Sequence, residues 1–352
     1  MDTSLLSIFA PAIMAFGIGI AITPIVTHFL YKHKVWKKKA GKIAIGGKVA
    51  EVFNELKGDG ETKTPRMGGI VIWGSILLTL LLTYALSVFT SYTLFDNLNF
   101  FSRSQTLIPA AALAVGALIG FLNDFYDISH EGRGLSLKVR LLLITILSGT
   151  LGWWFFAKLG VTSIGIPFDG ALEVGILIIP FFIFLTIALY ASGVIDGIDG
   201  LSGGVFASVF CAYAGIAIIQ SQFHIAAFCA TVVGAILAFL WFNVPPARFW
   251  MTETGSMALT LCLATIVFMT DSLGDGHGIS LLLIVGLPLI ATVASNVIQV
   301  SYKKMTGKKL FKIAPLHHHF EAIGWPSYKV TMRYWIISIV CALIGVAIAT
   351  IA

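Results

Sequence analysis

The sequence predicts an all-α membrane protein of about ten transmembrane helices, organised as one polytopic domain over residues 1–352. Two observations predict this fold class. The 352 residues are 57% hydrophobic and only 11% charged, with a mean hydropathy of +0.92, whereas about 25% of the residues in an ordinary soluble domain are charged. Apolar stretches long enough to cross a bilayer, which takes roughly 20 residues, also recur along the whole chain.

No Lys or Arg precedes the first apolar stretch, and lysines follow it at once. This is the reverse of a signal peptide, so we expect a retained first helix with the N-terminus outside. The four cysteines lie within the apolar stretches and share no metal-ligand spacing, so neither disulfides nor zinc are indicated. The stretches, of which the third and eighth are short, lie near 5–31, 68–92, 106–122, 139–157, 171–191, 202–220, 224–244, 256–270, 279–301 and 332–352.

Basic residues are distributed unequally between the two sides of the predicted membrane domain. With the N-terminus outside, 21 of the 23 Lys and Arg residues lie in or at the edges of the inner loops, which are 32–67, 123–140, 192–201, 245–255 and 302–331. Because positive charge marks the cytoplasmic side, these loops are predicted to face the cytoplasm. Such a surface attracts membrane lipids and anionic substrates. No nucleic-acid partner is expected, because few aromatic side chains interleave with the lysines.

Eleven of the seventeen Asp and Glu residues also lie in these inner loops, although Lys and Arg alone set the orientation. The segments NDFYD (123–127) and DGIDG (196–200) each place two carboxylates three residues apart, on one face if the chain is helical. Glu253 and the run HHHFE (317–321) lie in two further loops. Asp-Gly pairs often form turns, but ionisable groups at the membrane edge in three successive inner loops are functional candidates.

Clustered carboxylates without nearby cysteines are typical ligands of a hard cation. Mg²⁺ takes one or two carboxylates, several waters and substrate phosphates. Neighbouring lysines and histidines favour a phosphorylated substrate, because cations neutralise its charge and a histidine can move a proton. The residues alone therefore predict Mg²⁺-dependent phosphoryl transfer at a cytoplasmic membrane surface.

Five motifs in order along the chain resemble the polyprenyl-phosphate N-acetylhexosamine-1-phosphate transferases. They are TPRMGG (64–69), GLS (134–136), DGIDGL (196–201), TGSMAL (254–259) and APLHHHFE (314–321) followed by GW (324–325). The last motif is similar to the branch that transfers phospho-N-acetylmuramoyl-pentapeptide, whereas relatives that use other sugars tend to carry a different histidine motif. The likeness runs from about residue 20 to the C-terminus.

The resemblance implies one transferase domain of ten helices, with both termini outside, a cytoplasmic active site, Mg²⁺ and a homodimer in the bacterial inner membrane. The implied reaction moves phospho-MurNAc-pentapeptide from UDP-MurNAc-pentapeptide to undecaprenyl phosphate. It gives lipid I and UMP, a step of peptidoglycan synthesis that supports cell wall biogenesis and cell shape.

The resemblance also implies roles for individual residues. Asp124 matches the second aspartate of the family's Asp-Asp pair and would handle the lipid phosphate, while Asp196 and Asp199 match aspartates near metal and nucleotide. Three histidines match a substrate-contacting cluster, and Lys63 lies near basic residues that face the pyrophosphate. The predicted catalytic residues are Asp124, Asp196, His317 and His318, and the predicted substrate-binding residues are Lys63, Asp199 and His319.

Four positions depart from the family's pattern. Asn123 replaces the first aspartate of the pair, and an amide cannot act as a base. Gly193 replaces an asparagine, Glu253 a metal-ligating aspartate, and Asp127 a lysine. Because Asp127 lies one helical turn from Asp124, we expect a rearranged Mg²⁺ neighbourhood that consists of Asp124, Asp127, Asp196 and Glu253. Its predicted metal ligands are Glu253, Asp196 and Asp127.

Three alternatives stay open. The departures favour a transferase for another UDP-sugar, or a paralogue that binds its ligands with weak or no turnover, whereas the run at 317–321 opposes both. A transporter would place ionisable residues near the bilayer midplane and show internal repeats. The apolar stretches are nearly free of charge and show no convincing repeat.

Overall fold

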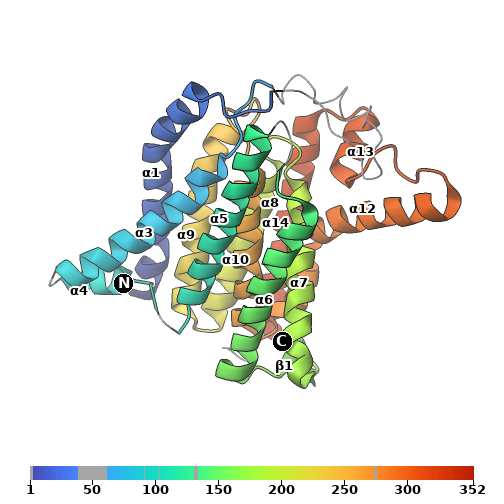
Figure 1. Cartoon of the computed structure of the whole chain (residues 1–352). Helices are drawn as coiled ribbons and strands as arrows, with labels where there is room; N and C mark the ends of the chain where they lie inside the picture. Colours follow the sequence, from blue (N-terminus) through green and yellow to red (C-terminus); the bar gives the residue numbers. More distant parts are fainter. Residues whose placement is uncertain (1–2, 39–61, 91, 103, 131–133, 273–275) are drawn as a thin grey trace.

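The computed structural model is a bundle of long helices (Figure 1), and it describes residues 3–38, 62–90, 92–102, 104–130, 134–272 and 276–352. Within these ranges, nine helices are long and apolar enough to cross a membrane. The fold class predicted from the sequence is confirmed. Eight of these nine membrane-spanning helices are α1 (Thr3–Lys32), α3 (Gly69–Phe89), α5 (Leu107–Ser129), α6 (Leu137–Leu159), α8 (Leu201–Ile219), α9 (Phe223–Asn243), α10 (Thr252–Ser272) and α14 (Ser327–Ile351). The other is α7 (Ile178–Ser192) with the 3-10 turns η1 (Gly175–Leu177) and η2 (Gly193–Ile195) at its ends.

A tenth span is present if α11 (Gly278–Val285) and α12 (Leu287–Thr306) are counted together. The two helices are bent by 71° at the break between them. Pro288, near the start of α12, accounts for the break, because proline lacks an N–H and its ring clashes with the carbonyl four residues earlier. As a result α12 projects from the bundle (Figure 1).

Short elements connect the long helices. They are α4 (Thr93–Leu98), α13 (Leu316–Ala322) and the antiparallel strands β1 (Ser163–Ile166) and β2 (Gly170–Glu173). The fifth predicted span, 171–191, therefore starts too early, since its first residues belong to β2. The β1–β2 hairpin is attached to the end of α10 that is distant from Thr252. There Gly165 N of β1 and Ile279 N of α11 each donate to the Asp271 carboxylate at 3.1 Å.

Two helices extend further into the predicted inner loops than their hydropathy indicates. The sequence predicts a loop from 123, but α5 continues to Ser129, and α10 begins at Thr252 rather than at 256. The reason is that the polar groups at these two ends satisfy one another. Asp124 is fully buried and accepts hydrogen bonds from Thr254, so neither helix has to end where its polar residues begin.

The helix α10 lies at the centre of the bundle and almost all of its residues are buried. Glycines of two neighbouring helices allow its first turns to be approached closely. A Cβ on Gly69 of α3 would collide with the backbone of Gly255, and a Cβ on Gly120 of α5 would collide with the carbonyl of Glu253. Small residues serve this purpose in membrane helices generally, so α3 and α5 fix the position of the start of α10.

We predict that Gly120→Ala lowers the stability of the protein by about 1–3 kcal/mol, because the added methyl group overpacks the contact with Glu253. The thermal unfolding midpoint of the purified protein measures this effect. Gly149→Ala in α6 is the matched control, since a Cβ there meets only Ile183 Cδ1 at 3.7 Å and should leave the midpoint unchanged. Equal midpoints for both variants would contradict the close approach.

Candidate active site

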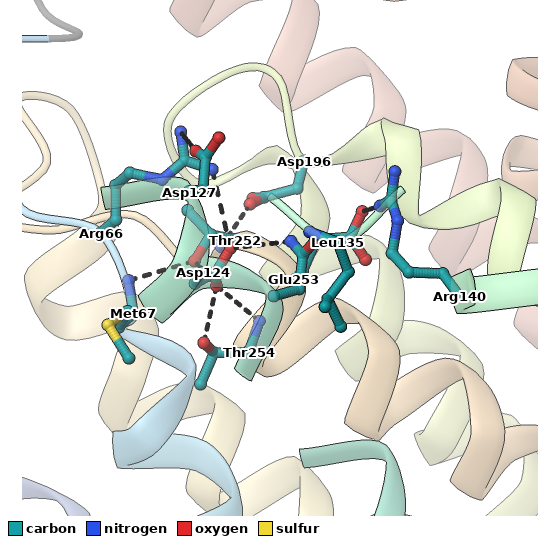
Figure 2. A network of polar contacts seen from close by, with 11 residues as sticks. Arg66, Met67, Asp124, Asp127, Leu135, Arg140, Asp196, Thr252, Glu253 and Thr254 are labelled. Carbon is teal, nitrogen blue, oxygen red and sulfur yellow. Dashed lines mark hydrogen bonds and ion pairs between the residues drawn. The ribbon is translucent and has the colours of Figure 1, made fainter. Parts of the chain in front are cut away.

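Four segments meet at the first turn of α10. The segment before α3 and the segment before α10 are joined by backbone hydrogen bonds: Gly68 N donates to Trp250 O at 2.8 Å, and Trp250 N donates to Pro65 O at 2.9 Å. The end of α5 and the loop 196–200 approach the same turn through their carboxylates (Figure 2).

Asp124 is completely buried and is held on the first turn of α10. Its Oδ2 accepts three hydrogen bonds, from Thr252 Oγ1 at 2.5 Å, Thr254 N at 2.8 Å and Thr254 Oγ1 at 2.6 Å. Its Oδ1 lies 3.7 Å from the guanidinium of Arg66. Hydrogen bonds to an ionised carboxylate are stronger than neutral ones, so the first turn of α10 is tightly fixed to α5.

Asp196 contacts the same turn from the other side. Its Oδ2 accepts from Thr252 N at 2.8 Å and its Oδ1 accepts from Ser202 Oγ at 2.7 Å. Burial raises the pKa of this carboxyl above its usual value, because the charged form loses its hydration. For an acid with a raised pKa, the stability contribution is present at low pH and is lost as the pH rises through the folded-state pKa. The ionised form of Asp196 is therefore less favourable in the folded protein than in the unfolded chain.

Arg66 is the cation that contacts the two aspartates of α5. Its guanidinium lies 3.3 Å from Asp127 and 3.7 Å from Asp124, and its side chain is 16% exposed. Asp127 stands where the family pattern has a lysine. The structure shows that the reversed charge has a partner, because Arg66 comes from the segment before α3 to neutralise it (Figure 2).

Glu253 also forms a close ion pair. Its Oε1 accepts from Arg140 Nη1 at 2.6 Å, with both side chains partly exposed. The carboxylate lies in the first turn of α10, where the helix dipole favours a negative charge. Arg140 lies near the start of α6, so this pair connects α6 to α10.

The side-chain amide of Asn123 contacts two neighbours, and its Nδ2 donates to Asp124 Oδ1 at 3.4 Å, which an aspartate could not do. The Oδ1 of Asn123 accepts from Leu135 N at 3.1 Å, and the backbone of Gly134 lies so close that a Cβ there would be 2.7 Å from the same oxygen. The amide therefore anchors the GLS segment to the end of α5.

Asp199 uses both carboxylate oxygens to hold the loop that leads to α10. Its Oδ2 accepts from Ala247 N and its Oδ1 from Trp250 Nε1, each at 3.1 Å. Asn243, at the end of α9, supports the same loop by donating to Phe249 O at 2.8 Å. Asp199 thus positions the loop rather than facing the network of Figure 2.

His317 and His318 lie on α13 and are buried against the loop 196–200. A Cβ on Gly197 would lie 2.6 Å from His318 Nε2 and 2.7 Å from His317 Nε2, so only glycine fits there. His318 Nδ1 donates to Glu321 Oε2 at 2.7 Å, and Ser327 Oγ donates to Glu321 Oε1 at 2.5 Å. Glu321 therefore orients the imidazole of His318 so that its Nε2 faces the backbone beside Asp196.

Two predicted substrate-binding residues have different surroundings. His319 accepts from Lys312 N at 3.2 Å and its ring lies 5.5 Å from that of Phe311, which shapes the segment before α13. Lys63 is exposed in a turn before Arg66.

Comparisons with known proteins place the chain in a family. Residues 106–271 match the model of glycosyl transferase family 4. A phospho-N-acetylmuramoyl-pentapeptide-transferase from Geobacillus sp. (strain WCH70) is 36% identical over 296 residues, which cover 82% of this chain and 84% of the relative. The chain belongs to this transferase family. Proteins of the same name from Bacillus mycoides (strain KBAB4) and Bacillus anthracis (strain A0248) are 34% and 33% identical over 340 residues, or 95% of this chain and of each relative.

The structure brings most of the predicted site residues of this family member to one end of the bundle. The carboxylates of Asp124, Asp127, Asp196 and Glu253 surround the start of α10, and His317 and His318 adjoin it through Gly197. Sequence reasoning missed Arg66, Arg140 and Thr252. Arg66 had a signal, because it is the charged residue of the TPRMGG motif, whereas Thr252 is conspicuous only through its contacts.

The donor set suits Mg²⁺ in chemical type. Asp196, Glu253 and Asp127 offer carboxylate oxygens with lone pairs beyond those used above. In the part of the chain that the structure describes, no three His, Cys, Asp or Glu side chains gather closely enough to hold a metal ion by themselves. Mg²⁺ often takes only one or two carboxylates and completes its shell with water and phosphate. The residues therefore fit a metal ion that substrate helps to hold, and the metal ligands stay a prediction.

We predict that Asp199→Asn lowers stability by about 1–3 kcal/mol, because the new amide NH₂ would face an N–H donor and leave it without an acceptor. The thermal midpoint should fall together with activity. Asp169→Asn, in the exposed turn of the hairpin, is the control. An unchanged midpoint with a raised KM for the nucleotide substrate would instead assign Asp199 to substrate binding.

Proposed function

We propose that the protein transfers phospho-MurNAc-pentapeptide from UDP-MurNAc-pentapeptide to undecaprenyl phosphate, with Mg²⁺ as cofactor, giving lipid I and UMP. The observation that carries the proposal is the gathering of carboxylates and histidines around the start of α10 in a member of this family. The proposal includes a homodimer in the bacterial inner membrane with the active site facing the cytoplasm. The one-sided distribution of 21 of the 23 basic residues supports this orientation.

The reaction balances without a net proton. An oxygen of the acceptor phosphate attacks the phosphorus that carries the sugar, the bond from that phosphorus to the bridging oxygen breaks, and UMP leaves with that oxygen. A phosphate monoester has a second pKa near 6, so the acceptor is largely a dianion at about pH 7. No carboxylate base is then required, which is consistent with an amide at Asn123 and with the three hydrogen bonds that Oδ2 of Asp124 already accepts.

The charge of the network favours a divalent cation. Four carboxylates and two guanidinium groups meet there, an excess of two negative charges when all are ionised. They belong to Asp124, Asp127, Asp196 and Glu253, and to Arg66 and Arg140. Bound Mg²⁺ would supply the missing charge and neutralise phosphate oxygens, held by Asp196, Glu253 and Asp127.

The remaining residues orient the substrates and neutralise their charge. Two anionic substrates must approach each other, and fixed cations stabilise such a transition state. Among the residues that the structure describes, Arg66 and Arg140 pair with these carboxylates. His318, oriented by Glu321, would in its doubly protonated form donate from Nε2 to a phosphate oxygen beside the loop 196–200.

The decisive assay measures UMP release by the purified protein from UDP-MurNAc-pentapeptide and undecaprenyl phosphate. We expect release that requires Mg²⁺ and falls by about 100-fold or more in Asp196→Asn, while Asp169→Asn retains the activity of the unchanged protein. UMP release that does not require Mg²⁺ and is unchanged in Asp196→Asn would contradict the assignment. Release only with another UDP-sugar would identify a related transferase, and no release with any would identify an inactive paralogue.

A further inference from the structure

Thr252 has a backbone conformation that threonine rarely adopts. Its φ is +55°, and Met67, which contacts it, has a φ of +68°. A β-branched side chain is disfavoured in this left-handed region, and such strained residues cluster at functional sites, where the surroundings hold them in place. Glycine would adopt the same conformation without steric cost, so the side chain is what threonine adds here.

That side chain and its own amide connect three segments. The hydroxyl of Thr252 donates to Asp124 Oδ2 at 2.5 Å and accepts from Met67 N at 3.1 Å, while the amide donates to Asp196 Oδ2 at 2.8 Å (Figure 2). Thr254 and Ser202 each contact only one of these two carboxylates, Thr254 that of Asp124 and Ser202 that of Asp196.

We propose that Thr252 is a positioning residue that fixes the separation of Asp124 and Asp196 for phosphoryl transfer. This rests on the function proposed above. Two carboxylates that carry the same charge repel each other, and Thr252 donates to both Asp124 and Asp196. Thr252 supplies both donors from one residue, so its hydroxyl determines how the two carboxylates are spaced.

Three variants separate the hydroxyl from the backbone strain. Thr252→Ser keeps the hydroxyl, Thr252→Val keeps the shape without it, and Thr252→Gly removes both the hydroxyl and the strain. We expect Thr252→Ser to retain kcat, and the other two to lose about tenfold or more with a smaller change in the KM for UDP-MurNAc-pentapeptide. Thr252→Gly should nevertheless unfold at a higher temperature than Thr252→Val, because both lack the hydroxyl and only glycine relieves the strain. Full activity of Thr252→Gly, or losses of activity that follow the unfolding temperature in all three variants, would overturn the proposal.

A second measurement separates this proposal from the proposed function. Hydrogen exchange of the peptide around Thr254, whose amide donates to Asp124, should be faster in Thr252→Gly than in the unchanged protein and in Thr252→Ser. This readout needs no turnover. If the unchanged protein releases no UMP while the exchange contrast is seen, the transferase assignment fails and the link made by Thr252 stands. Equal exchange in all the proteins overturns the link itself.

An independent observation concerns a cavity of about 420 Å³ at the end of α1. It lies between the last turns of α1, the end of α9 and the loop before α10. Its lining includes Thr27, His28, Tyr31, Lys32, Phe242 and Arg248.

The chemistry of the lining favours an anion. Lys32 and Arg248 carry positive charge, and none of the described residues that line the cavity is acidic. The buried hydroxyl oxygen of Thr27 has no hydrogen-bond partner in the structure, and such a group is costly unless something satisfies it. Tyr31 OH donates to Arg248 O at 3.0 Å, which holds the two sides of the cavity together.

The surroundings of the cavity favour a lipid as the source of that anion. On the same end of α1, Ile25 and Phe29 are 60% and 54% exposed, in a helix long and apolar enough to cross the membrane. Basic groups at the end of such a span attract anionic head groups. We propose that this cavity binds the phosphate of an anionic glycerophospholipid between Lys32 and Arg248, with the acyl chains along the apolar surface of α1.

Native mass spectrometry of the full chain tests this proposal with phosphatidylglycerol and phosphatidylcholine supplied together. The unchanged protein and the control Lys308→Gln/Lys309→Gln, whose lysines are exposed, should retain phosphatidylglycerol preferentially. Lys32→Gln/Arg248→Gln, which removes the same number of charges, should lose that preference. Lys32→Gln alone serves as a milder variant, and inorganic phosphate should not compete.

Three results would overturn the lipid site. One is equal retention of phosphatidylglycerol by all the proteins, and a second is displacement of the lipid by inorganic phosphate, which would indicate a soluble ligand. The third is dissociation of a dimer in Lys32→Gln/Arg248→Gln with lipid retention unchanged, which would show that a second copy of the chain covers the cavity.

Discussion

A buried carboxylate, Asp124, and a half-buried one, Asp196, come from distant parts of the chain and cap the start of one central helix, and the geometry of the site depends on this arrangement. The first amides of a helix have no partner within it. Here Thr252 N donates to Asp196 and Thr254 N donates to Asp124. The helix dipole favours negative charge at the same place, so capping and charge placement reinforce each other. The close glycine contacts of α3 and α5 then hold Glu253 beside the capped turn.

The membrane spans could be predicted from the sequence because hydropathy reports directly on contact with lipid. The polar ends of the spans could not be predicted, because a charged residue indicates a loop unless the residue that pairs with it is known. Asp127 illustrates this. Its place one turn from Asp124 follows from helical spacing, but its pairing with Arg66 joins residues 61 positions apart. Asp199 shows the converse, because its motif indicates a ligand site while its oxygens hold a loop.

The departures from the family pattern each have a local physical account. The amide of Asn123 accepts from Leu135 N, and the charge of Asp127 is neutralised by Arg66. Gly193 lies close to α10, where a Cβ would be 3.3 Å from Ser256 Oγ. These substitutions are therefore accommodated by the fold, and the two that place a carboxylate, Asp127 and Glu253, each lie beside a guanidinium group.

The order of the capping residues along the chain has a consequence for biosynthesis. Arg66, Asp124 and Asp196 all precede α10 in the sequence, so each is made and inserted before the helix whose first turn satisfies it. Until α10 arrives, the two aspartates are charged groups at the membrane edge without their main donors, and such groups are costly there. Insertion of α10 is thus the step at which the site becomes a single ordered unit. Fragments of the chain that end before residue 252 lack α10 and therefore lack this ordered site.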